Sequence, residues 1–292
     1  HGTSRGLGDV YKRQIPYSWG AETPLSNFEI RLDDATRPRQ DPAVTVAFDL
    51  FSENGAPTST KILAWTTTPW TLPSNLALAV APDKLYALIE TPKCQYIIGK
   101  ETIASFTESF GDFNILETFK GQDLVDLRYQ PLFPYFQDLD TQAFRIIAGD
   151  FIEMDEGTGV VHIAPGFGED DQRIADDNGI PTVVPVDDEG TFTEEITDWF
   201  GVNVFDANPL IIRKLKESGR IIRHDTYEHN YPHCWRTDTP IIYRAVPSWY
   251  VKVTEIKDRL VEINQEINWI PENVREGRFG KLSLIHISEP TR

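Results

Sequence analysis

The sequence predicts an α+β fold: a β-barrel-like or strongly curved sheet with peripheral helices and flanking connective segments. Short runs of β-branched and aromatic residues recur between residues 44 and 224, divided by turn-forming residues, and few stretches have helical periodicity. Such spacing is typical of a closed or curved antiparallel or mixed sheet with helices outside. A chain of 292 residues, 40% of them hydrophobic, can also bury a sizeable core.

The first half of the chain supplies most of the predicted strands. The alternating residues 44–51 indicate a half-buried strand, and the apolar run 61–66 indicates a second strand that Pro69 stops. Residues 85–90 and 95–98 are typical of a hairpin. The remaining elements expected here are a short helix over 101–110, strands over 114–119 and 144–148, and an irregular proline-rich run over 131–136.

The second half is centred on a predicted strand-turn-helix corner. Residues 160–163 indicate a strand, and residues 169–178 indicate a helix that Gly179 ends. The elements expected after it are a buried strand over 181–186, a helix over 208–218, a strand over 219–224, and a helix over 256–267 that Pro271 stops.

The predicted organisation has five parts. Both ends resemble translated adapter sequence, so we expect them to be foreign to the fold. The parts are a non-native tail over 1–14, a linker over 15–43, the main domain over 44–224, a return segment over 225–280, and a second non-native tail over 281–292.

Three consecutive threonines, Thr66, Thr67 and Thr68, are the first candidate site. They follow a strand, and Pro69 and Pro73 restrict the backbone after them. Threonine hydroxyls donate and accept hydrogen bonds without carrying charge, so they can bind a polar ligand without attacking it. An ordinary strand-to-turn junction would explain the same pattern, because threonine is a common strand residue.

His162 and Asp171 flank the strand-turn-helix corner and form the second candidate site. A structural explanation is available for both, because a lone strand histidine is usually a satisfied core residue and acids are favoured in the first turn of a helix. The carboxylates of residues 187–189 are more typical of a solvated loop than of a metal site. The His and Cys residues in 229–234 lack further ligands for zinc, so no metal is assigned.

Two stretches resemble the motifs of one known family. TTTPWTLPSN, from Thr66 to Asn75, resembles the threonine-rich signature of the editing domain of isoleucyl-tRNA synthetases. GTGVVHIAPGFGEDD, from Gly157 to Asp171, resembles the second editing motif, with Gly166 where alanine is more usual. The valyl and leucyl relatives carry arginine at the position of Thr68, which favours the isoleucyl branch.

The resemblance implies a β-barrel-like editing core and the hydrolysis of valine from wrongly charged tRNA(Ile) by a positioned water. Binding alone separates isoleucine from valine poorly, and double-sieve editing is the known remedy. The implied roles are as follows: Thr66, Thr67 and Thr68 hold the aminoacyl ester and ribose, Asp171 pairs with the α-ammonium, Trp70 and Asn75 shape the pocket, and His162 bounds the side-chain pocket.

The resemblance also implies partners. These are the 3′ end of tRNA(Ile) and the aminoacylation domain of the same polypeptide. The sequence contains no HIGH-type or KMSKS-type motif, so we expect this piece not to activate an amino acid. ATP and Mg²⁺ would belong to the aminoacylation domain, and no cofactor is expected here.

Composition limits these readings. The net charge of −17 conflicts with strong tRNA binding, unless the piece holds only the 3′ end. Cys94 and Cys234 are far apart, which favours a reducing, cytoplasmic setting, and no apolar run approaches the length of a membrane span. Two alternatives stay open: a non-catalytic binding module, and a valyl-type editing domain that prefers Thr-tRNA.

Overall fold

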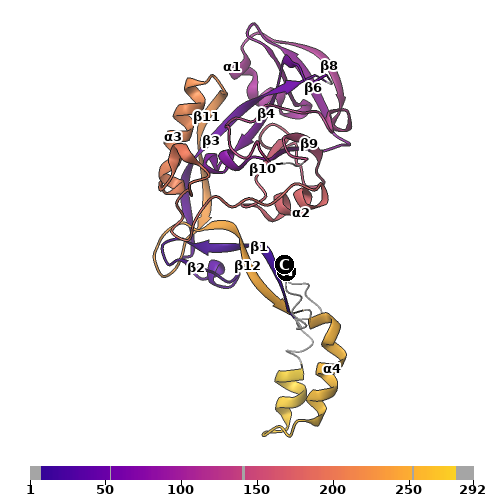
Figure 1. Cartoon of the computed structure of the whole chain (residues 1–292), viewed down its shortest axis with the longest axis vertical. Coiled ribbons are helices and arrows are strands. Elements are labelled where there is room, and N and C mark those ends of the chain that lie inside the picture. The colour runs from indigo at the N-terminus through magenta and orange to yellow at the C-terminus, as the bar shows by residue number, and fades with distance from the viewer. Residues whose placement is uncertain (1–7, 53, 140–141, 252, 281–292) are drawn as a thin grey trace. The chain divides into compact units, whose positions relative to one another are not determined.

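The computed structural model describes residues 8–52, 54–139, 142–251 and 253–280 (Figure 1). The chain divides into two compact units, residues 14–245 and residues 1–13 with 246–292. The strands β1 (Gly8–Ser18) and β12 (Ile242–Val251) each span a boundary between the units. The predicted tail over 281–292 lies outside the described residues, and the predicted domain bounds stay predictions.

The larger unit is built on a six-stranded sheet with the order β11-β3-β4-β7-β6-β8. Neighbouring strands are antiparallel, except that β4 and β7 are parallel. The strands are β11 (Ile221–Pro232), β3 (Thr36–Phe51), β4 (Pro57–Thr66), β7 (Gln95–Gly99), β6 (Leu85–Glu90) and β8 (Asn114–Lys120).

The core of this sheet consists of apolar side chains that are buried on both faces of the central strands β3 and β4, so the half-buried strand predicted over 44–51 is instead covered on both sides. Phe48, Ile62 and Leu63 are completely buried. Phe48 packs edge-on against Tyr129, with the ring centroids 5.1 Å apart. Burying several such side chains contributes about 1.5–3 kcal/mol each, which fixes the end of β4 on a rigid base.

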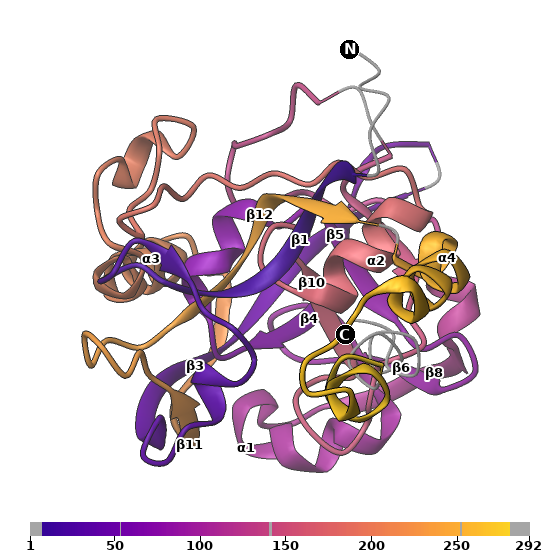
Figure 2. The ribbon, with the colours of Figure 1, turned by 90° about the horizontal axis from the view of Figure 1, so that it is seen from below.

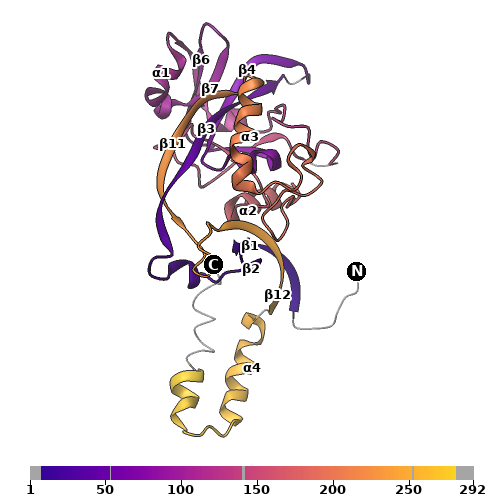
Figure 3. The ribbon, with the colours of Figure 1, turned by 90° about the vertical axis from the view of Figure 1, so that its left-hand side faces the viewer.

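Strand β3 begins at Thr36, so the prediction of a strand starting at residue 44 was wrong about its start. The early part contains prolines and charges and has no strand periodicity. It is extended because it pairs with β11, from Thr36 opposite Pro232 to Val46 opposite Ile221. Figure 3 shows β3 and β11 side by side as one long curved ribbon. Pairing between such distant segments is absent from any local pattern.

A second sheet of three strands has the order β10-β5-β9. Its strands are β10 (Val160–Ile163), β5 (Ala77–Val80) and β9 (Arg145–Ala148). A third sheet has the order β12-β1-β2, with β2 at Thr23–Pro24. The α+β class is confirmed. Among the described residues the sheets stay separate and do not close into one barrel.

The helices lie between and beside the sheets. The α-helices are α1 (Thr107–Phe110), α2 (Glu169–Asp177), α3 (Val204–Glu217) and α4 (Val253–Glu266). The 3₁₀ helices are η1 (Glu29–Arg31), η2 (Pro69–Ser74), η3 (Lys100–Phe106), η4 (Gly121–Leu124) and η5 (Thr197–Trp199), and η6 (Arg275–Phe279) is a π-helix. None of the helices in the described part is long and apolar enough to span a membrane.

The strand-turn-helix corner is confirmed. Strand β10 and helix α2 are joined by a short turn (Figure 2), and Gly179 follows the helix at φ +69°. This left-handed conformation favours glycine and ends the helix where the sequence predicts. The predicted strands over 85–90, 95–98, 114–119 and 144–148 and the short helix over 101–110 are confirmed within one or two residues.

Three further predictions were wrong. The strand predicted over 219–224 continues to Pro232 as β11, because its second half pairs with the early part of β3. Residues 181–186 form no strand, and only Val186 makes an isolated bridge, to Phe192. Two prolines interrupt the donors of this run, and its backbone lies against the corner turn, where a Cβ on Gly166 would be 2.1 Å from the Val183 carbonyl oxygen. Helix α3 starts before residue 208, because Asn203 caps it by accepting the Phe205 N–H at 3.1 Å.

Candidate functional site

Four side chains form a hydrogen-bonded row at the end of β4. Thr66 Oγ1 lies 3.2 Å from Thr68 Oγ1, which lies 3.2 Å from Thr71 Oγ1. Thr71 Oγ1 in turn lies 2.9 Å from His162 Nε2. The backbone N–H of Thr68 also donates to Thr66 Oγ1 at 3.1 Å. The structure therefore connects the predicted threonine site to the predicted histidine.

The row exists because η2 turns the chain sharply after β4. Pro69 and Pro73 fix φ in this 3₁₀ helix, and all six of its residues are buried. The N–H of Thr71 donates to the Thr68 carbonyl oxygen at 3.0 Å, which closes the turn. His162 arrives from a distant strand, since β10 pairs with β5 and places His162 opposite Leu78.

Thr67 differs from the threonines on either side. It is half-buried, and its hydroxyl makes no hydrogen bond to any residue that the structure describes. Thr66 and Thr68 use their hydroxyls inside the row. Thr67 is therefore the threonine whose hydroxyl is available to a ligand.

His162 is a neutral imidazole. Burial lowers the pKa of His162 from 6.5 to about 4. Its Nδ1 is buried and has no hydrogen-bond partner in the described chain. A general base works best with a pKa near the operating pH, so this histidine is poorly suited to that role.

Asp171 lies in the first turn of α2, close to the end of β10. Its Oδ2 accepts the Ala164 N–H at 2.8 Å. Burial raises the pKa of Asp171 from 3.8 to about 7, and the neighbouring Asp170 raises it further, while the bond from Ala164 opposes the rise. Gly168 makes room for this carboxyl group, because a Cβ there would lie 2.9 Å from it. Within the described residues, no lysine, arginine or histidine forms an ion pair with this carboxyl group, and its described partner is the Ala164 N–H.

Trp70 is held between the two halves of the site. Its indole packs edge-on against Phe167 in the corner turn, with centroids 4.8 Å apart. Its backbone N–H donates to Asn208 Oδ1 at 2.9 Å. Trp70 therefore connects the threonine segment to the turn before Asp171 and to helix α3.

Asn75 has a structural environment. Its Nδ2 donates to the Ala77 carbonyl oxygen at 2.7 Å, and its Oδ1 accepts the Tyr129 hydroxyl at 2.7 Å. The side chain is buried and both ends of the amide are used within the protein. Asn75 lies at the end of η2, so it fixes the segment that carries the threonines.

A cavity of about 530 Å³ lies beside the strand end. Trp65, the residue before the row, is in its wall together with Tyr227, and their ring centroids are 5.7 Å apart. Asp155 and Glu156 contribute carboxylates to the same wall. The cavity offers aromatic faces, hydrogen-bond acceptors and the guanidinium of Arg223; of the segment around the row, only Trp65 is in its wall, and neighbouring side chains of a strand point to opposite faces of the sheet.

The sequence reasoning missed two residues of the site. Thr71 links Thr68 to His162, and the sequence could have pointed to it, because Thr71 lies within the threonine-rich motif itself. Asn208 had no local signal. It is a polar residue on the buried face of a helix, and only the tertiary packing shows its bond to Trp70.

No three His, Cys, Asp or Glu side chains gather closely enough to hold a metal ion in the described part of the chain. The expectation of no metal is untested by this observation, and it stays a prediction. Cys94 and Cys234 are both free thiols.

Comparison with known proteins identifies the family. The family model described as tRNA synthetases class I (I, L, M and V) matches residues 5–284. The chain belongs to the class I tRNA synthetases. Curated isoleucine–tRNA ligases are similar to it: that of Rickettsia africae (strain ESF-5) is 54% identical over 284 residues, covering 95% of this chain and 26% of the relative. That of Rickettsia prowazekii (strain Madrid E) is 52% identical over 286 residues, covering 92% and 26%.

The chain spans about a quarter of the length of these curated relatives, 26% in each case. Among solved structures, one titled "The crystal structure of GlLeuRS-CP1" is 15% identical, with a TM-score of 0.49, over 63% of this chain and 98% of that chain. The editing domain of the P. knowlesi cytosolic leucyl-tRNA synthetase is 11% identical, with a TM-score of 0.47, over 67% and 99%.

Proposed function

We propose that this chain is the editing unit of an isoleucyl-tRNA synthetase, which hydrolyses the ester between valine and the 3′-terminal adenosine of tRNA(Ile). The observation that carries the proposal is the hydrogen-bonded row from Thr66 to the neutral His162, with Asp171 bonded to Ala164, two residues beyond His162. The similar proteins named isoleucine–tRNA ligase support it.

Water is the nucleophile in this proposal. Among the described residues of the row, the hydroxyl that bonds the imidazole is that of Thr71, and both Thr71 and His162 are buried. A buried hydroxyl cannot reach an ester, and a histidine with a pKa of about 4 is a weak base. Catalysis then comes from holding the ester and a water in a reactive orientation.

Each end of the substrate has a matching group. The α-ammonium of valine pairs with the Asp171 carboxylate, and the hydroxyl of Thr67 donates to the ester. His162 lies at the inner end of the row and limits the length of the amino acid side chain. These matches explain why the site contains hydroxyls and one carboxylate, since a positioned water requires no charged catalytic pair.

The cavity beside Trp65 receives the terminal adenosine. Adenine stacks on aromatic faces such as those of Trp65 and Tyr227, which is worth about 1–3 kcal/mol per base. The carboxylates of Asp155 and Glu156 can accept hydrogen bonds from ribose hydroxyls, while Arg223 in the same lining is paired with Asp225. The cavity therefore suits the chain end of a tRNA, where the last nucleoside has free ribose hydroxyls.

The wider setting is also part of the proposal. Amino acid activation, with ATP and Mg²⁺, belongs to the aminoacylation domain of the same polypeptide, and the editing unit works without a cofactor. Two free thiols are compatible with the reducing cytoplasm, where we place the protein.

One assay tests the proposal. The purified chain is mixed with tRNA(Ile) charged with valine, threonine or isoleucine, and release of the amino acid is followed. We expect hydrolysis of Val-tRNA(Ile) to be fastest and that of Ile-tRNA(Ile) to be slowest. Faster hydrolysis of the threonine ester than of the valine ester would indicate a valyl-type domain instead, and tRNA binding without turnover would indicate a binding module.

A further inference from the structure

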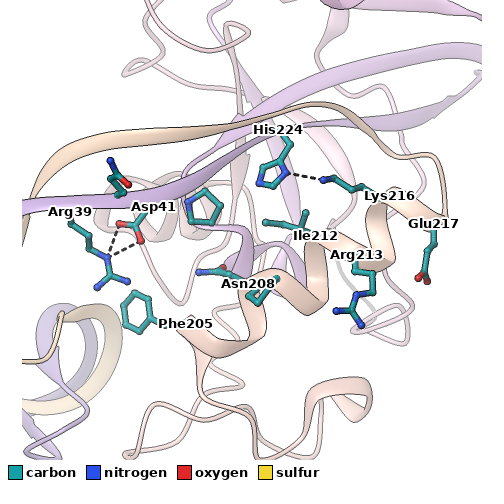
Figure 4. A pocket seen from close by; sticks show the side chains of 12 residues that line it. Arg39, Asp41, Phe205, Asn208, Ile212, Arg213, Lys216, Glu217 and His224 are labelled. Atoms are coloured by element: carbon teal, nitrogen blue, oxygen red, sulfur yellow. Dashed lines mark hydrogen bonds and ion pairs between the residues drawn. The ribbon is translucent and has the colours of Figure 1, made fainter.

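A second cavity, of about 570 Å³, lies between α3 and the ribbon of β3 and β11 (Figure 4). We call it the α3 groove. Its floor is apolar and consists of Pro42, Phe205, Pro209 and Ile212. Ligand sites commonly have volumes of about 300–1,000 Å³ with an apolar lining and a few fixed polar groups. The groove therefore has the size of a small-ligand site.

The polar groups of the α3 groove are mostly hydrogen-bond donors. The Nε of Arg39 donates to both oxygens of Asp41, at 2.8 and 2.9 Å. The guanidinium of Arg39 also lies over the Phe205 ring, 4.7 Å from its centroid. Only Nε bonds to Asp41, and Figure 4 shows the terminal nitrogens of Arg39 beside Phe205 at one end of the groove.

Asn208 contributes a buried donor to the groove wall. Its side chain is 5% exposed, and its Oδ1 is used by the Trp70 N–H at 2.9 Å. Its Nδ2 makes no hydrogen bond to any described residue, and this nitrogen is not fully enclosed by protein atoms. The Nδ2 hydrogens are therefore accessible from the groove.

Two cationic residues, Arg213 and Lys216, lie on the C-terminal turns of α3. Arg213 is exposed and makes no ion pair with a described residue, while the Lys216 ammonium lies 2.9 Å from His224 Nδ1. Burial and the neighbouring Lys216 lower the pKa of His224, which leaves this imidazole neutral at pH 7. Glu217 is the one acid at this end of the groove.

The acids of the groove do not offset these donors. Asp41 is paired twice, with Arg39 and with His229 Nε2 at 2.9 Å. This leaves Arg213 and Lys216 against the single carboxylate of Glu217. A local excess of cations in a chain of net charge −17 indicates an anionic ligand. The apolar floor further indicates that this ligand has a flat, apolar part.

We propose that the α3 groove binds one nucleotide of an RNA strand, with the base on Phe205 and Pro209 and the phosphate at Arg213 and Lys216. The inference rests on the proposed function in one respect: that function is the reason for choosing RNA as the source of the nucleotide. The groove is a different site from the threonine row, although Asn208 belongs to one wall of the groove and also holds Trp70.

The test measures binding of a short single-stranded RNA to the whole chain by calorimetry at about 50 and 200 mM salt. Arg213→Ala and Lys216→Ala should each weaken binding about 5- to 10-fold at low salt and reduce the salt slope by about 0.7. Both side chains are exposed, so these variants should fold. Lys93→Ala is the matched control, because it removes an exposed cation on the hairpin between β6 and β7.

Three results would overturn the proposal. They are equal losses in Lys93→Ala and Arg213→Ala, equal affinity for adenosine monophosphate and the RNA, and equal affinity for an abasic strand of the same length. Deacylation of Val-tRNA(Ile) by the parent chain is measured in parallel. If that reaction fails while RNA binding depends on Arg213 and Lys216, the groove stands and the editing proposal falls.

Discussion

His162 and Asp171 show how burial alone can give two titratable residues unusual states. Burial lowers the pKa of His162 to about 4 and raises that of Asp171 to about 7, since both residues lose hydration of their charged form. The histidine is therefore neutral throughout the physiological range. The aspartate is only partly ionised at neutral pH until an ammonium group pairs with it.

Asp171→Asn should weaken recognition of the α-ammonium. The variant keeps an oxygen to accept the Ala164 N–H but loses the charge. A charge-assisted hydrogen bond is worth about 1.5–3 kcal/mol, so hydrolysis of Val-tRNA(Ile) should fall by about one to two orders of magnitude. Single-turnover kinetics measure this, and unchanged rates would remove Asp171 from substrate binding.

The same substitution should change the pH dependence of stability. Because the folded-state pKa of Asp171 is raised from 3.8 to about 7, the native protein binds more protons than the unfolded chain between these values, and stability falls as pH rises through this window. The Tm of Asp171→Asn relative to the parent should therefore be higher at pH 8 than at pH 5. Asp112→Asn is the control, because Asp112 is an exposed carboxylate in the segment between α1 and β8 and does not contribute to the pKa shift of Asp171. A pH-independent difference for Asp171→Asn would contradict the raised pKa.

His162→Ala should widen the amino acid pocket. If the imidazole excludes the extra methylene of isoleucine by overlap, a cost of about 1–3 kcal/mol disappears with it. The variant, placed in a full-length synthetase, should begin to hydrolyse Ile-tRNA(Ile) while it still hydrolyses Val-tRNA(Ile). The ratio of the two rates is the measurement. An unchanged ratio would show that His162 does not set the size limit, and a general base would slow both substrates together.

At the scale of elements, the threonine segment works because a strand, a 3₁₀ helix and a distant strand meet. The end of β4 supplies Thr66, η2 supplies Thr71, and β10 supplies His162. The turn between the first two leaves Thr67 outside the row. One sequence motif therefore contains hydroxyls with different tasks.

Thr67→Val and Thr68→Val should separate these tasks. Thr67 makes no hydrogen bond within the described chain, so Thr67→Val should leave the Tm nearly unchanged while hydrolysis of Val-tRNA(Ile) falls about 10-fold or more. Thr68→Val breaks the contacts to Thr66 and Thr71 and should cost about 1–3 kcal/mol of stability. Thermal unfolding and deacylation of both variants are compared. Equal losses of stability in the two variants would contradict the assignment of Thr67 to the ligand and Thr68 to the internal row.

Local patterns predicted some elements better than others. Periodicity and turn residues placed β6, β7 and the corner of β10 and α2 well, because short-range preferences decide them. They failed for the start of β3, because that stretch is extended only through its pairing with the distant strand β11. They also failed for residues 181–186, because prolines prevent this run from pairing as a strand. Strand β5 was missed, since its apolar run has no alternation, and it is the strand that brings His162 into register.

At the scale of the whole molecule, the two units differ in how much they bury. The unit of residues 14–245 contains the apolar core, including Phe48 and Ile62. Among the side chains described between residues 255 and 280, only Asn264 is buried. Leu260, Ile263 and Ile267 on or just after α4 are 37–39% exposed. An isolated helix of this length is marginal in water without packing.

Hydrogen exchange should report this difference directly. The amides of α4 should exchange orders of magnitude faster than those of β3 and β4, because opening α4 exposes little additional apolar surface. Mass spectrometry of peptides from the intact chain measures both. Equal protection of α4 and the central strands would show that α4 is stabilised by contacts beyond its own unit.

The candidate site was predictable only in part, for a related reason. Thr66, Thr67, Thr68, His162 and Asp171 stand in two stretches that resemble family motifs, so the sequence pointed to them. Their states were not predictable. The neutrality of the histidine and the internal use of Asn75 depend on burial and on partners such as Tyr129, which come from distant parts of the chain.

The row of hydroxyls has one direction, and this follows from counting hydrogen atoms. Thr71 Oγ1 lies 2.8 Å from the Thr68 carbonyl oxygen, which has no hydrogen, so the hydroxyl hydrogen of Thr71 must lie between them. Thr71 then accepts from Thr68 Oγ1 and from His162 Nε2, and Thr68 accepts from Thr66. The imidazole hydrogen is thereby placed on Nε2, and the buried Nδ1 is a bare lone pair. The Thr66 hydroxyl at the outer end donates to Thr68 and already accepts the Thr68 N–H, so what it has left for a ligand is an acceptor lone pair. In the proposed function, the hydroxyl hydrogen for the ester oxygen is therefore that of Thr67.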